Sequence, residues 1–450
     1  MMATPGTTGL RWAEIIAVGT ELLAPPRLDT NSLVITAGLN QLGIEVRAKT
    51  VVGDRREDVA AVLRAALTRV DLVVVCGGLG PTDDDLTRHA VAGLLHLKLV
   101  EDPNVAERIR QRFASRGMRM PDINRRQAMV PVGAEVLPNP HGTAPGLWIE
   151  RDGRTIILLP GPPAELEPMF TRIVAERLSP RASGQKIFRK VLSICGRTES
   201  EVEELVFPTY SRWMSEPLPV ATTVLTGPAQ IELHLSVRAA TEAEGLARLD
   251  EASTQVADVV GPDLFSRDGS ALEKVVGDVL RAQGCSIAVA ESCTGGLISS
   301  RLTDVAGSSD YVFANAVCYT NDSKKLWLGV PVALMQEHGS VSQEVAMAMA
   351  DGIRERTGVD VGVGVTGIAG PSGGSERKPV GTVAIAVVTP TARVARTFRF
   401  SGDRKRVKQF AAQMALDMVR RLLVGAEIAE TTPGVIVPPQ SLRHNHSGSV

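Results

Sequence analysis

Ser292 is the residue of this chain whose surroundings most favour chemistry. It lies in the turn Glu291–Gly296, between a short buried-strand pattern at Ile287–Ala290 and a helical run that begins near Leu297. A strand that ends in such a turn and restarts as a helix leaves backbone N–H groups unpaired at the helix N-terminus, where anions and developing oxyanions bind. The Ser292 hydroxyl could act there as a nucleophile, or it could only cap the helix.

A serine nucleophile needs a neighbouring base, and lysine is the candidate here. Before its tail, the last domain has a single histidine, His338, in a stretch that has the pattern of a helix end. A lysine can act as the base when desolvation lowers its pKa. Lys324 follows the strand pattern Asp310–Thr320, so it could take the proton of Ser292, with Tyr319 orienting or relaying that proton.

Other residues near this turn offer an alternative nucleophile and a phosphate site. Cys293 could replace Ser292 as the nucleophile, but no histidine partner is evident for its thiol. A buried strand runs into a second glycine-rich turn within Val361–Gly374, and Gly402–Arg404 opens the last helix. A helix N-terminus with an arginine suits a dianionic phosphate, although Arg404 could also be an ordinary surface arginine in a basic run.

A second candidate site is the loop Cys76–Asp85, which reads CGGLGPTDDD. Its glycines allow a backbone cradle for phosphate, and it lacks the lysine of a P-loop. Three consecutive aspartates beside a phosphate would repel it unless a divalent cation bridged the two. The alternative is an acidic helix N-terminus, in which Asp83 to Asp85 only complement the helix dipole.

An alternation of strands and helices in the amino-terminal part of the chain positions the loop Cys76–Asp85. Strand patterns at 13–18, 45–52 and 71–75 are separated by helical patterns at about 31–42 and 57–70. This alternation predicts a parallel, doubly wound sheet, in which ligands bind at the carboxyl ends of the strands. Gly19–Glu21 and Cys76–Asp85 both fall at such ends.

Length and composition restrict the class of protein. A chain of 450 residues predicts two or three domains, and the formal charge of −1 gives no reason to expect binding to nucleic acid or an anionic membrane. The five cysteines form no CxxC pair, which favours a reduced, cytoplasmic protein. No apolar run approaches the roughly 20 residues of a membrane span, and the start of the chain lacks a signal-peptide pattern. Residues 427–450 are expected to form a disordered tail.

Between Leu272 and Leu423 the chain strongly resembles the carboxy-terminal domain of the CinA family, the nicotinamide mononucleotide (NMN) deamidases. The resemblance rests on AESCTGGL, YTNDSK, GSVS, TGIAGPSGG and KPVGTV, in the family's order and spacing. It implies that Ser292 attacks the NMN carboxamide, that Lys324 is its base, and that ammonia and nicotinate mononucleotide are released without a metal. The expected site residues are Ser292, Lys324, Tyr319 and Thr294 for catalysis, the amides of Thr294, Gly295 and Gly296 for the oxyanion, and Thr366, Gly367, Gly370 and Arg404 for the substrate.

The motifs GTELL, DTNS and GGLGPTDDDLT resemble the amino-terminal domain of the same family, which is related in fold to molybdopterin-binding proteins. Relatives of this domain are metal-dependent ADP-ribose pyrophosphatases that form AMP and ribose 5-phosphate. One departure is Ala24–Arg27, where two prolines replace a Gly-Gln-like turn of the family. The implied residues are Glu21, Asp84 and Asp85 for the metal or its water, and Gly77, Gly78, Gly80, Thr82, Asn31, Thr143, Gly146, Pro160 and Gly161 for the substrate.

The expected architecture is α/β throughout. It consists of a three-layer molybdopterin-binding-like domain (11–170), a small KH-type α+β module (171–262) and an α/β amidohydrolase domain (270–426). RNA-binding KH domains use a GxxG loop, and Gly196–Glu199 lacks its second glycine, so the module is expected to be a spacer or an oligomerisation element. Gly261–Ser266 is the expected linker to the last domain.

The sequence therefore predicts a cytoplasmic hydrolase of pyridine-nucleotide metabolism, with small nucleotides as partners and, by family resemblance, a homodimeric state. Two alternatives from other classes stay open. The amino-terminal domain could bind a pterin or nucleotide without turnover. The whole chain could instead be a competence-related interaction protein, although its near-neutral charge argues against direct contact with DNA.

Overall fold

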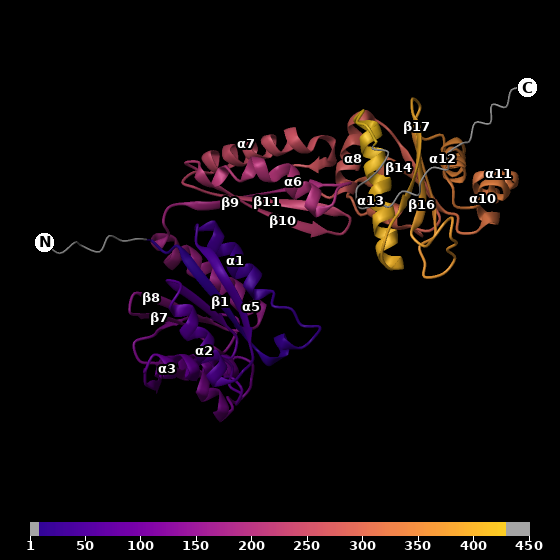
Figure 1. Cartoon of the computed structure of the whole chain (residues 1–450). Helices are drawn as coiled ribbons and strands as arrows, with labels where there is room; N and C mark the ends of the chain where they lie inside the picture. Colours follow the sequence, from indigo (N-terminus) through magenta and orange to yellow (C-terminus); the bar gives the residue numbers. More distant parts are fainter. Residues whose placement is uncertain (1–8, 429–450) are drawn as a thin grey trace, which may run out of the picture. The chain divides into compact units, whose positions relative to one another are not determined.

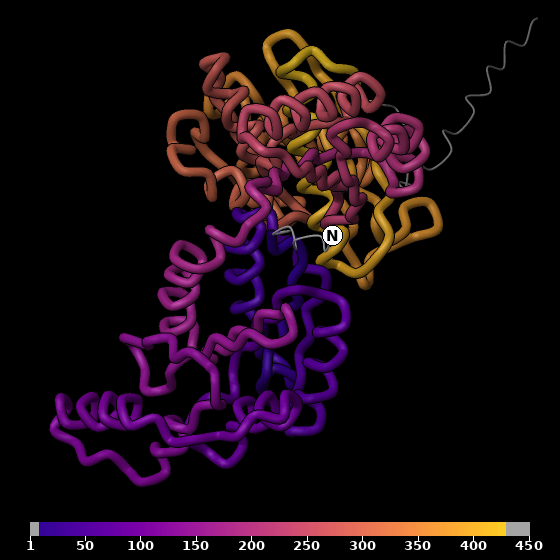
Figure 2. The backbone as a smooth tube through the Cα atoms, turned by 90° about the vertical axis from the view of Figure 1, so that its left-hand side faces the viewer, coloured from indigo at the N-terminus to yellow at the C-terminus, as the bar shows by residue number. Residues whose placement is uncertain are grey.

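The computed structural model describes residues 9–428, which form two compact units (Figure 1). The first unit contains residues up to 188 and residues 238–246, and the second contains residues 189–237 and the chain from 247 onward. In the backbone trace the first unit begins in indigo, and the second ends in yellow (Figure 2). The tail predicted to be disordered lies, from residue 429 onward, outside the described residues.

A six-stranded sheet is the middle layer of the first unit, in the order β2-β1-β3-β8-β7-β6. The first four strands are parallel, and β7 and β6 are antiparallel to their neighbours. Helices α1 and α5 pack on one face and α2, α3 and α4 on the other, so the predicted three-layer fold is confirmed. The elements are β1 Trp12–Val18, α1 Asn31–Gln41, β2 Glu45–Val52, α2 Arg56–Leu67, β3 Leu72–Cys76, α3 Thr87–Leu94, β4 Leu99–Glu101, α4 Pro103–Ala114, β5 Met129–Pro131, β6 Glu135–Leu137, β7 Gly146–Arg151, β8 Arg154–Leu159 and α5 Pro163–Ile173.

The three strands predicted in this unit are confirmed as β1, β2 and β3. Strand β3 is apolar and buried along its whole length, as expected for a central strand of a sheet that helices cover on both faces. Because β1 and β3 are parallel neighbours, the loops Gly19–Glu21 and Cys76–Asp85 lie at the same edge of the sheet.

The second unit contains most of the middle module, whose four-stranded sheet has the order β10-β11-β9-β12. The prediction that Gly261–Ser266 is a linker is wrong. Leu264 pairs with Ile194, and the second half of the segment forms an edge strand, β12. The apolar side chains of the segment explain this, since Phe265 is buried in the core. The elements are β9 Lys186–Ile194, α6 Glu199–Tyr210, β10 Val220–Gly227, β11 Gln230–Ala239, α7 Glu242–Val260 and β12 Leu264–Ser266.

The middle module packs onto the hydrophobic core of the C-terminal domain. Cys195 and Phe265 of the module belong to the cluster that contains the helices and strands of the domain. Polar contacts reinforce this junction: Asp417 and Arg421 of the last helix are buried together, and Arg421 also binds Asp263 at 2.6 Å. The module is therefore not an independent spacer.

The C-terminal domain is built on a five-stranded sheet with the order β14-β13-β15-β16-β17. Strands β14, β13 and β15 are parallel, and β16 and β17 are antiparallel. The elements are α8 Leu272–Gln283, β13 Ile287–Glu291, α9 Leu297–Thr303, β14 Val312–Val317, α10 Asn321–Leu328, α11 Val332–His338, α12 Gln343–Thr357, β15 Val361–Gly367, β16 Thr382–Val388, β17 Arg393–Arg399 and α13 Arg404–Leu423.

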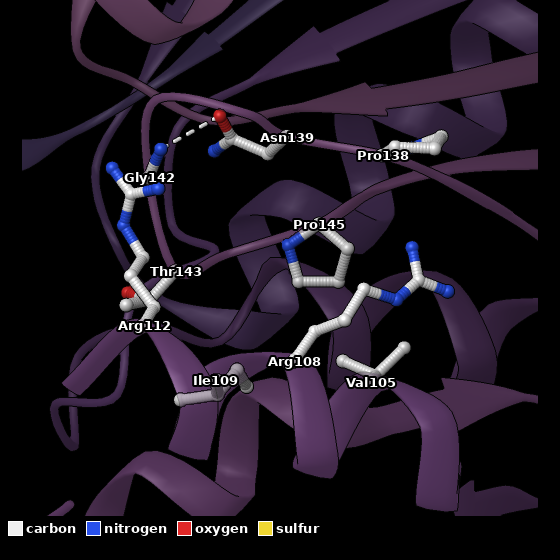
Figure 3. A pocket seen from close by; sticks show the side chains of 9 residues that line it. All are labelled: Val105, Arg108, Ile109, Arg112, Pro138, Asn139, Gly142, Thr143 and Pro145. Atoms are coloured by element: carbon white, nitrogen blue, oxygen red, sulfur yellow. Dashed lines mark hydrogen bonds between the residues drawn. The ribbon is translucent and has the colours of Figure 1, made fainter. Parts of the chain in front are cut away.

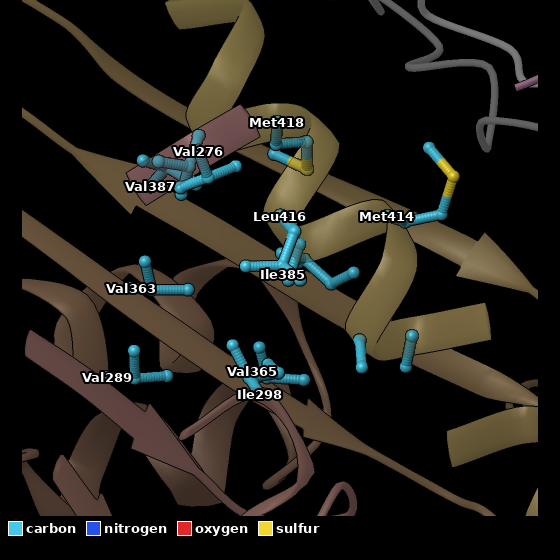
Figure 4. Packing of buried hydrophobic residues seen from close by; sticks show 14 of the residues in the cluster. Val276, Val289, Ile298, Val363, Val365, Ile385, Val387, Met414, Leu416 and Met418 are labelled. Carbon is cyan, nitrogen blue, oxygen red and sulfur yellow. The ribbon is translucent and has the colours of Figure 1, made fainter. Parts of the chain in front are cut away.

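The central strand β15 has two different faces. Val363 and Val365 pack with α8, α9 and α13, and Figure 4 shows them beside Ile385 and Leu416. On the opposite face, a Cβ at Gly364 would lie 2.1 Å from the Ala346 carbonyl oxygen of α12. The alternation of valine and glycine therefore lets α12 approach the backbone of the sheet directly.

We predict that Gly364→Ala lowers the free energy of unfolding of the second unit by about 1–3 kcal/mol, because the new methyl group has no space against α12. Chemical denaturation of the full chain measures the change. Gly161→Ala is the control, since its Cβ would meet nothing closer than 3.6 Å. Equal stability of the two variants would contradict the packing argument.

Candidate functional site

The turn that carries Ser292 is fixed by the preceding residue, Glu291. Its carboxylate is completely buried and accepts the amides of Gly296 at 3.0 Å, Ile298 at 3.2 Å and Ser299 at 2.8 Å. Glu291 therefore satisfies the N-terminus of α9, and Ser292 is not its cap. The hypothesis that Ser292 serves only as a helix cap is wrong, and the sequence analysis missed the role of Glu291.

The same bonds change the expected oxyanion site. The Gly296 amide binds Glu291, and the Gly295 amide donates to the Ser292 carbonyl at 3.1 Å, so neither is free for an oxyanion. Within residues 9–428, the amides of Cys293 and Thr294 donate to no acceptor. Thr294 is fully buried and its hydroxyl also lacks a partner. The Thr294 amide is thus free, as the predicted role requires, whereas the amides of Gly295 and Gly296 are already bonded.

Lys324 lies in the first turn of α10, where Thr320 and Ser323 form a capping box. It is only 3% exposed, and its Nζ lies 3.4 Å from the Thr366 hydroxyl, which itself donates to the Ser340 carbonyl at 2.7 Å. Burial lowers the pKa of Lys324, and no carboxylate of the described residues opposes that shift. This is the environment of a lysine that can lose its proton.

Strand pairing brings Ser292 and Lys324 to the same end of the sheet. Glu291 pairs with Val365, and the Ser292 amide donates to the Val365 carbonyl at 2.9 Å. Thr366, the contact of Lys324, is the next residue of β15. Ser292, which is 6% exposed, and the Lys324 ammonium bonded to Thr366 therefore lie at the same end of β15.

The Cys293 thiol lies at the same strand end and is close enough to Lys324 to affect its pKa, but it is buried. Its thiol belongs to the hydrophobic core, and a Cβ at Gly367 would lie 2.8 Å from its sulfur. Burial raises its pKa to about 12, so the thiolate is absent at neutral pH. Of the two possible nucleophiles, the structure favours Ser292.

Tyr319 makes no hydrogen bond to Lys324, so the structure gives no support to the expected proton relay. The chain turns outward after β14, which leaves Tyr319 55% exposed with its hydroxyl bonded to Arg404. Arg404 also donates to the Gly370 carbonyl at 2.8 Å. Three residues predicted for the site, Tyr319, Gly370 and Arg404, therefore form one cluster, and Arg404 is more than an ordinary surface arginine.

Lys408 is a candidate that the sequence analysis missed. It follows Arg404 by four residues on α13, so the two side chains lie on one face of that helix. A Cβ at Gly295 would lie 3.4 Å from the Lys408 ammonium, which places this charge beside the Ser292 turn. The spacing of four residues between Arg404 and Lys408 in the basic run was the feature of the sequence that could have indicated this pairing.

The first unit has a cavity of about 380 Å³ at the carboxyl ends of its strands. Two predicted residues do not line it: Asn31 donates to the Gly161 carbonyl at 2.7 Å, and Gly146 is a buried residue of β7. The segment Ala24–Arg27, where the sequence departs from the pattern of the family, does not line the cavity either. The predicted residues that do line it are Glu21, Gly77, Gly78, Gly80, Thr82, Asp84, Asp85, Thr143, Pro160 and Gly161.

The loop beside this cavity is held by its own charged residues. Asp85 accepts the amides of Gly80 at 2.7 Å and Thr82 at 2.9 Å, and Arg88 donates to the carbonyls of Leu79 and Gly80. Burial lowers the pKa of Arg88 to about 10, which still leaves it charged at neutral pH. Asp85 therefore shapes the loop.

Few amides of the loop remain for a phosphate. The Gly77 amide donates to the Leu159 carbonyl, and the Gly80 amide binds Asp85. Within the described ranges, the Gly78 and Leu79 amides have no acceptor. The predicted cradle thus narrows to these two N–H groups.

The aspartates are not part of a helix N-terminus, because α3 begins at Thr87 and has no acidic residue in its first turn. Asp84 is exposed, and a hydrogen bond from Thr82 lowers its pKa. No three metal-ligating side chains converge in the part of the chain that the structure describes. The carboxylates lining the cavity nevertheless suit a cation such as Mg²⁺, which keeps several waters and takes other ligands from substrate phosphates.

A smaller cavity of about 200 Å³ adjoins the acidic one, and Thr143 lines both. Figure 3 shows the Arg112 side chain reaching from α4 toward the loop that carries Gly142, whereas the Arg108 side chain extends the other way, past Pro145. Arg112 holds this loop by donating to its carbonyls at 140 and 141. A positively charged rim therefore lies next to the acidic cavity.

None of the described helices is both long enough and apolar enough to cross a membrane. Residues 14–180 match the family model described as a probable molybdopterin binding domain, and residues 269–423 match that of the CinA C-terminal domain. These two matches cover the two α/β domains.

The chain is 46% identical to a CinA-like protein of Koribacter versatilis, over 92% of this chain and 100% of that protein. It is 44% identical to a putative competence-damage inducible protein of Symbiobacterium thermophilum, over 92% of this chain and 99% of that protein. The crystal structure of the competence/damage inducible protein CihA from Agrobacterium tumefaciens is 38% identical, with a TM-score of 0.33, over 34% of this chain and 93% of that one. The chain belongs to the CinA family.

Proposed function

We propose that the C-terminal domain is an amidohydrolase in which Ser292 is the nucleophile and Lys324 is the general base. The observation that carries the proposal is a buried lysine with a lowered pKa and no carboxylate partner at the strand end that also carries Ser292. A neutral amine is then accessible at lower pH than for an ordinary lysine. The family resemblance indicates NMN as the substrate.

In the proposed reaction, Lys324 Nζ takes the Ser292 proton as Oγ bonds to the carboxamide carbon. The amides of Cys293 and Thr294 are the available donors for the developing oxyanion. Collapse of the tetrahedral intermediate breaks the C–N bond, and Lys324 returns the proton to the departing ammonia. Water then hydrolyses the acyl-enzyme to nicotinate mononucleotide. Arg404 and Lys408 supply positive charge for the phosphate of the substrate.

We propose that the amino-terminal domain hydrolyses a diphosphate such as ADP-ribose. A divalent cation held by Asp84 and Glu21 would neutralise phosphate charge and activate water. The support is the acidic cavity, together with the unpaired amides of Gly78 and Leu79, two residues that line it. Asp85 positions that loop.

We further propose a cytoplasmic homodimer that acts on small nucleotides without nucleic acid or membrane. All five cysteines are free, which suits a reducing compartment. A non-catalytic amino-terminal binding module and a competence-related interaction protein are the alternatives that the following measurements separate.

The deamidase is tested by ammonia release from NMN. We expect Lys324→Ala to lower the rate by about 10²–10⁴-fold, because it removes the base, and Ser292→Ala to lower it at least as much. Cys293→Ala is the matched control and should keep near-normal activity. Activity that survives in Ser292→Ala but disappears in Cys293→Ala would assign the nucleophile to the thiol.

Lys324→Met should stabilise the protein while it removes deamidase activity. Because folding lowers the lysine pKa, the wild type loses stability as the pH falls from the ordinary lysine pKa of 10.5 toward the lowered one. The variant lacks this penalty, so its advantage is largest at neutral pH and shrinks toward pH 10.5. Thermal unfolding at several pH values measures this, with the exposed Lys325→Met as control. A variant less stable than wild type at every pH contradicts the expected burial of charge.

For the amino-terminal domain, AMP release from ADP-ribose should require Mg²⁺ and stop with a chelator. Asp84→Asn should lower the rate at least about tenfold. Asp83→Asn, which affects a neighbouring aspartate paired with Arg126, should change it little. Equal AMP release from both variants would show that Asp84 does not hold the metal. If the wild type releases no AMP, the alternative of a non-catalytic amino-terminal binding module is favoured.

A further inference from the structure

A third cavity, of about 240 Å³, lies inside the second unit between the middle module and the C-terminal domain. One wall is the loop before α6 and the turn that joins β10 to β11. The other wall is the end of β17 and the first turns of α13. Ligand cavities are common at such junctions between structural modules.

The wall from the C-terminal domain combines aromatic rings with an unpaired cation. Phe400 and Phe410 lie with ring centroids 5.7 Å apart, and the Arg406 guanidinium lies 5.1 Å from the Phe410 centroid. Among the described residues, no carboxylate forms an ion pair with Arg406. Met414 completes an apolar floor, being 7% exposed.

The cation on the opposite wall is already engaged, because Arg197 is paired with Asp263 at 2.5 Å. Glu199 on that wall accepts a hydrogen bond from Thr226 at 2.6 Å and forms no ion pair among the described residues. Arg406 is therefore the cation that is left for a ligand. Apolar and aromatic walls with one free guanidinium suit a planar aromatic ring that carries a negative charge.

Helix α13 connects this cavity with the Ser292 site. Residues two apart on a helix are separated by about 200° around its axis, so Arg406 and Phe410 face away from Arg404 and Lys408. A Cβ at Gly402 would lie 2.5 Å from Cδ of Arg406, so the Arg406 side chain covers the loop that leads to Arg404. A ligand that binds Arg406 would therefore move or stiffen this loop.

We propose that this cavity binds a small planar aromatic carboxylate through Arg406 and Phe410, and that binding changes the affinity of the Ser292 site for its substrate. The second part rests on the proposed deamidase function, and the first does not.

Anthranilate is a suitable probe, because it is a planar aromatic carboxylate whose own fluorescence reports binding to the full chain. We expect saturable binding that Arg406→Gln weakens about tenfold and Phe410→Leu also weakens. The neighbouring Lys405→Gln is the matched control and should bind as wild type does. The neutral isostere 2-aminobenzamide should bind more weakly and be insensitive to Arg406→Gln. Absence of saturable anthranilate binding, or equal affinity of Arg406→Gln and wild type, overturns the proposal.

The coupling is read from KM for NMN in the ammonia assay, with and without anthranilate. A KM shift in wild type that is absent in Arg406→Gln supports coupling, whereas an equal shift in both overturns it. If anthranilate binds but no ammonia is released, the cavity assignment stands and the deamidase proposal fails. If ammonia is released but anthranilate does not bind, the deamidase proposal stands and the cavity assignment fails.

Discussion

The buried carboxylate of Glu291 is the constraint on which the candidate deamidase site depends. By accepting three backbone amides and the Ser299 hydroxyl, it sets where α9 begins and how the preceding turn is shaped. The Ser292 hydroxyl is thereby left out of the helix cap, and the amides of Cys293 and Thr294 stay unpaired. A carboxylate that satisfies the helix N-terminus thus leaves the neighbouring polar groups available for a substrate.

The first unit uses the same device at the corresponding place in its own sheet. Asp85 accepts loop amides after β3, as Glu291 accepts helix amides after β13. In each case an acidic side chain organises backbone at the carboxyl end of a parallel strand, where ligands of such sheets bind. The charge environments differ, because the Ser292 site has the positive charges of Lys324, Arg404 and Lys408, whereas the amino-terminal cavity is lined by carboxylates.

Much of the fold could be predicted from the sequence, because strand patterns such as LVVVC and VGVGV leave little choice of structure. The family and the strand ends that carry Ser292 and Lys324 were likewise evident. What could not be predicted is the choice of hydrogen-bond partners. Tyr319 binds Arg404 instead of Lys324, because that pairing depends on how α13, far along the chain, packs. Glu291 takes the Gly296 amide because of the local geometry of the turn, which the residue types alone do not specify.

The packing of the middle module onto the core of the C-terminal domain has a consequence for synthesis of the chain. Strand β9 is translated early, but β12 pairs with it about 70 residues later, and the side chains of α13 that cover Cys195 come near the end of the described chain. Most residues of the first unit precede β9, so that unit can fold while translation continues. The C-terminal domain cannot close its core until α13 has left the ribosome, and until then Cys195 and Phe265, where the middle module joins that core, remain uncovered in the nascent chain.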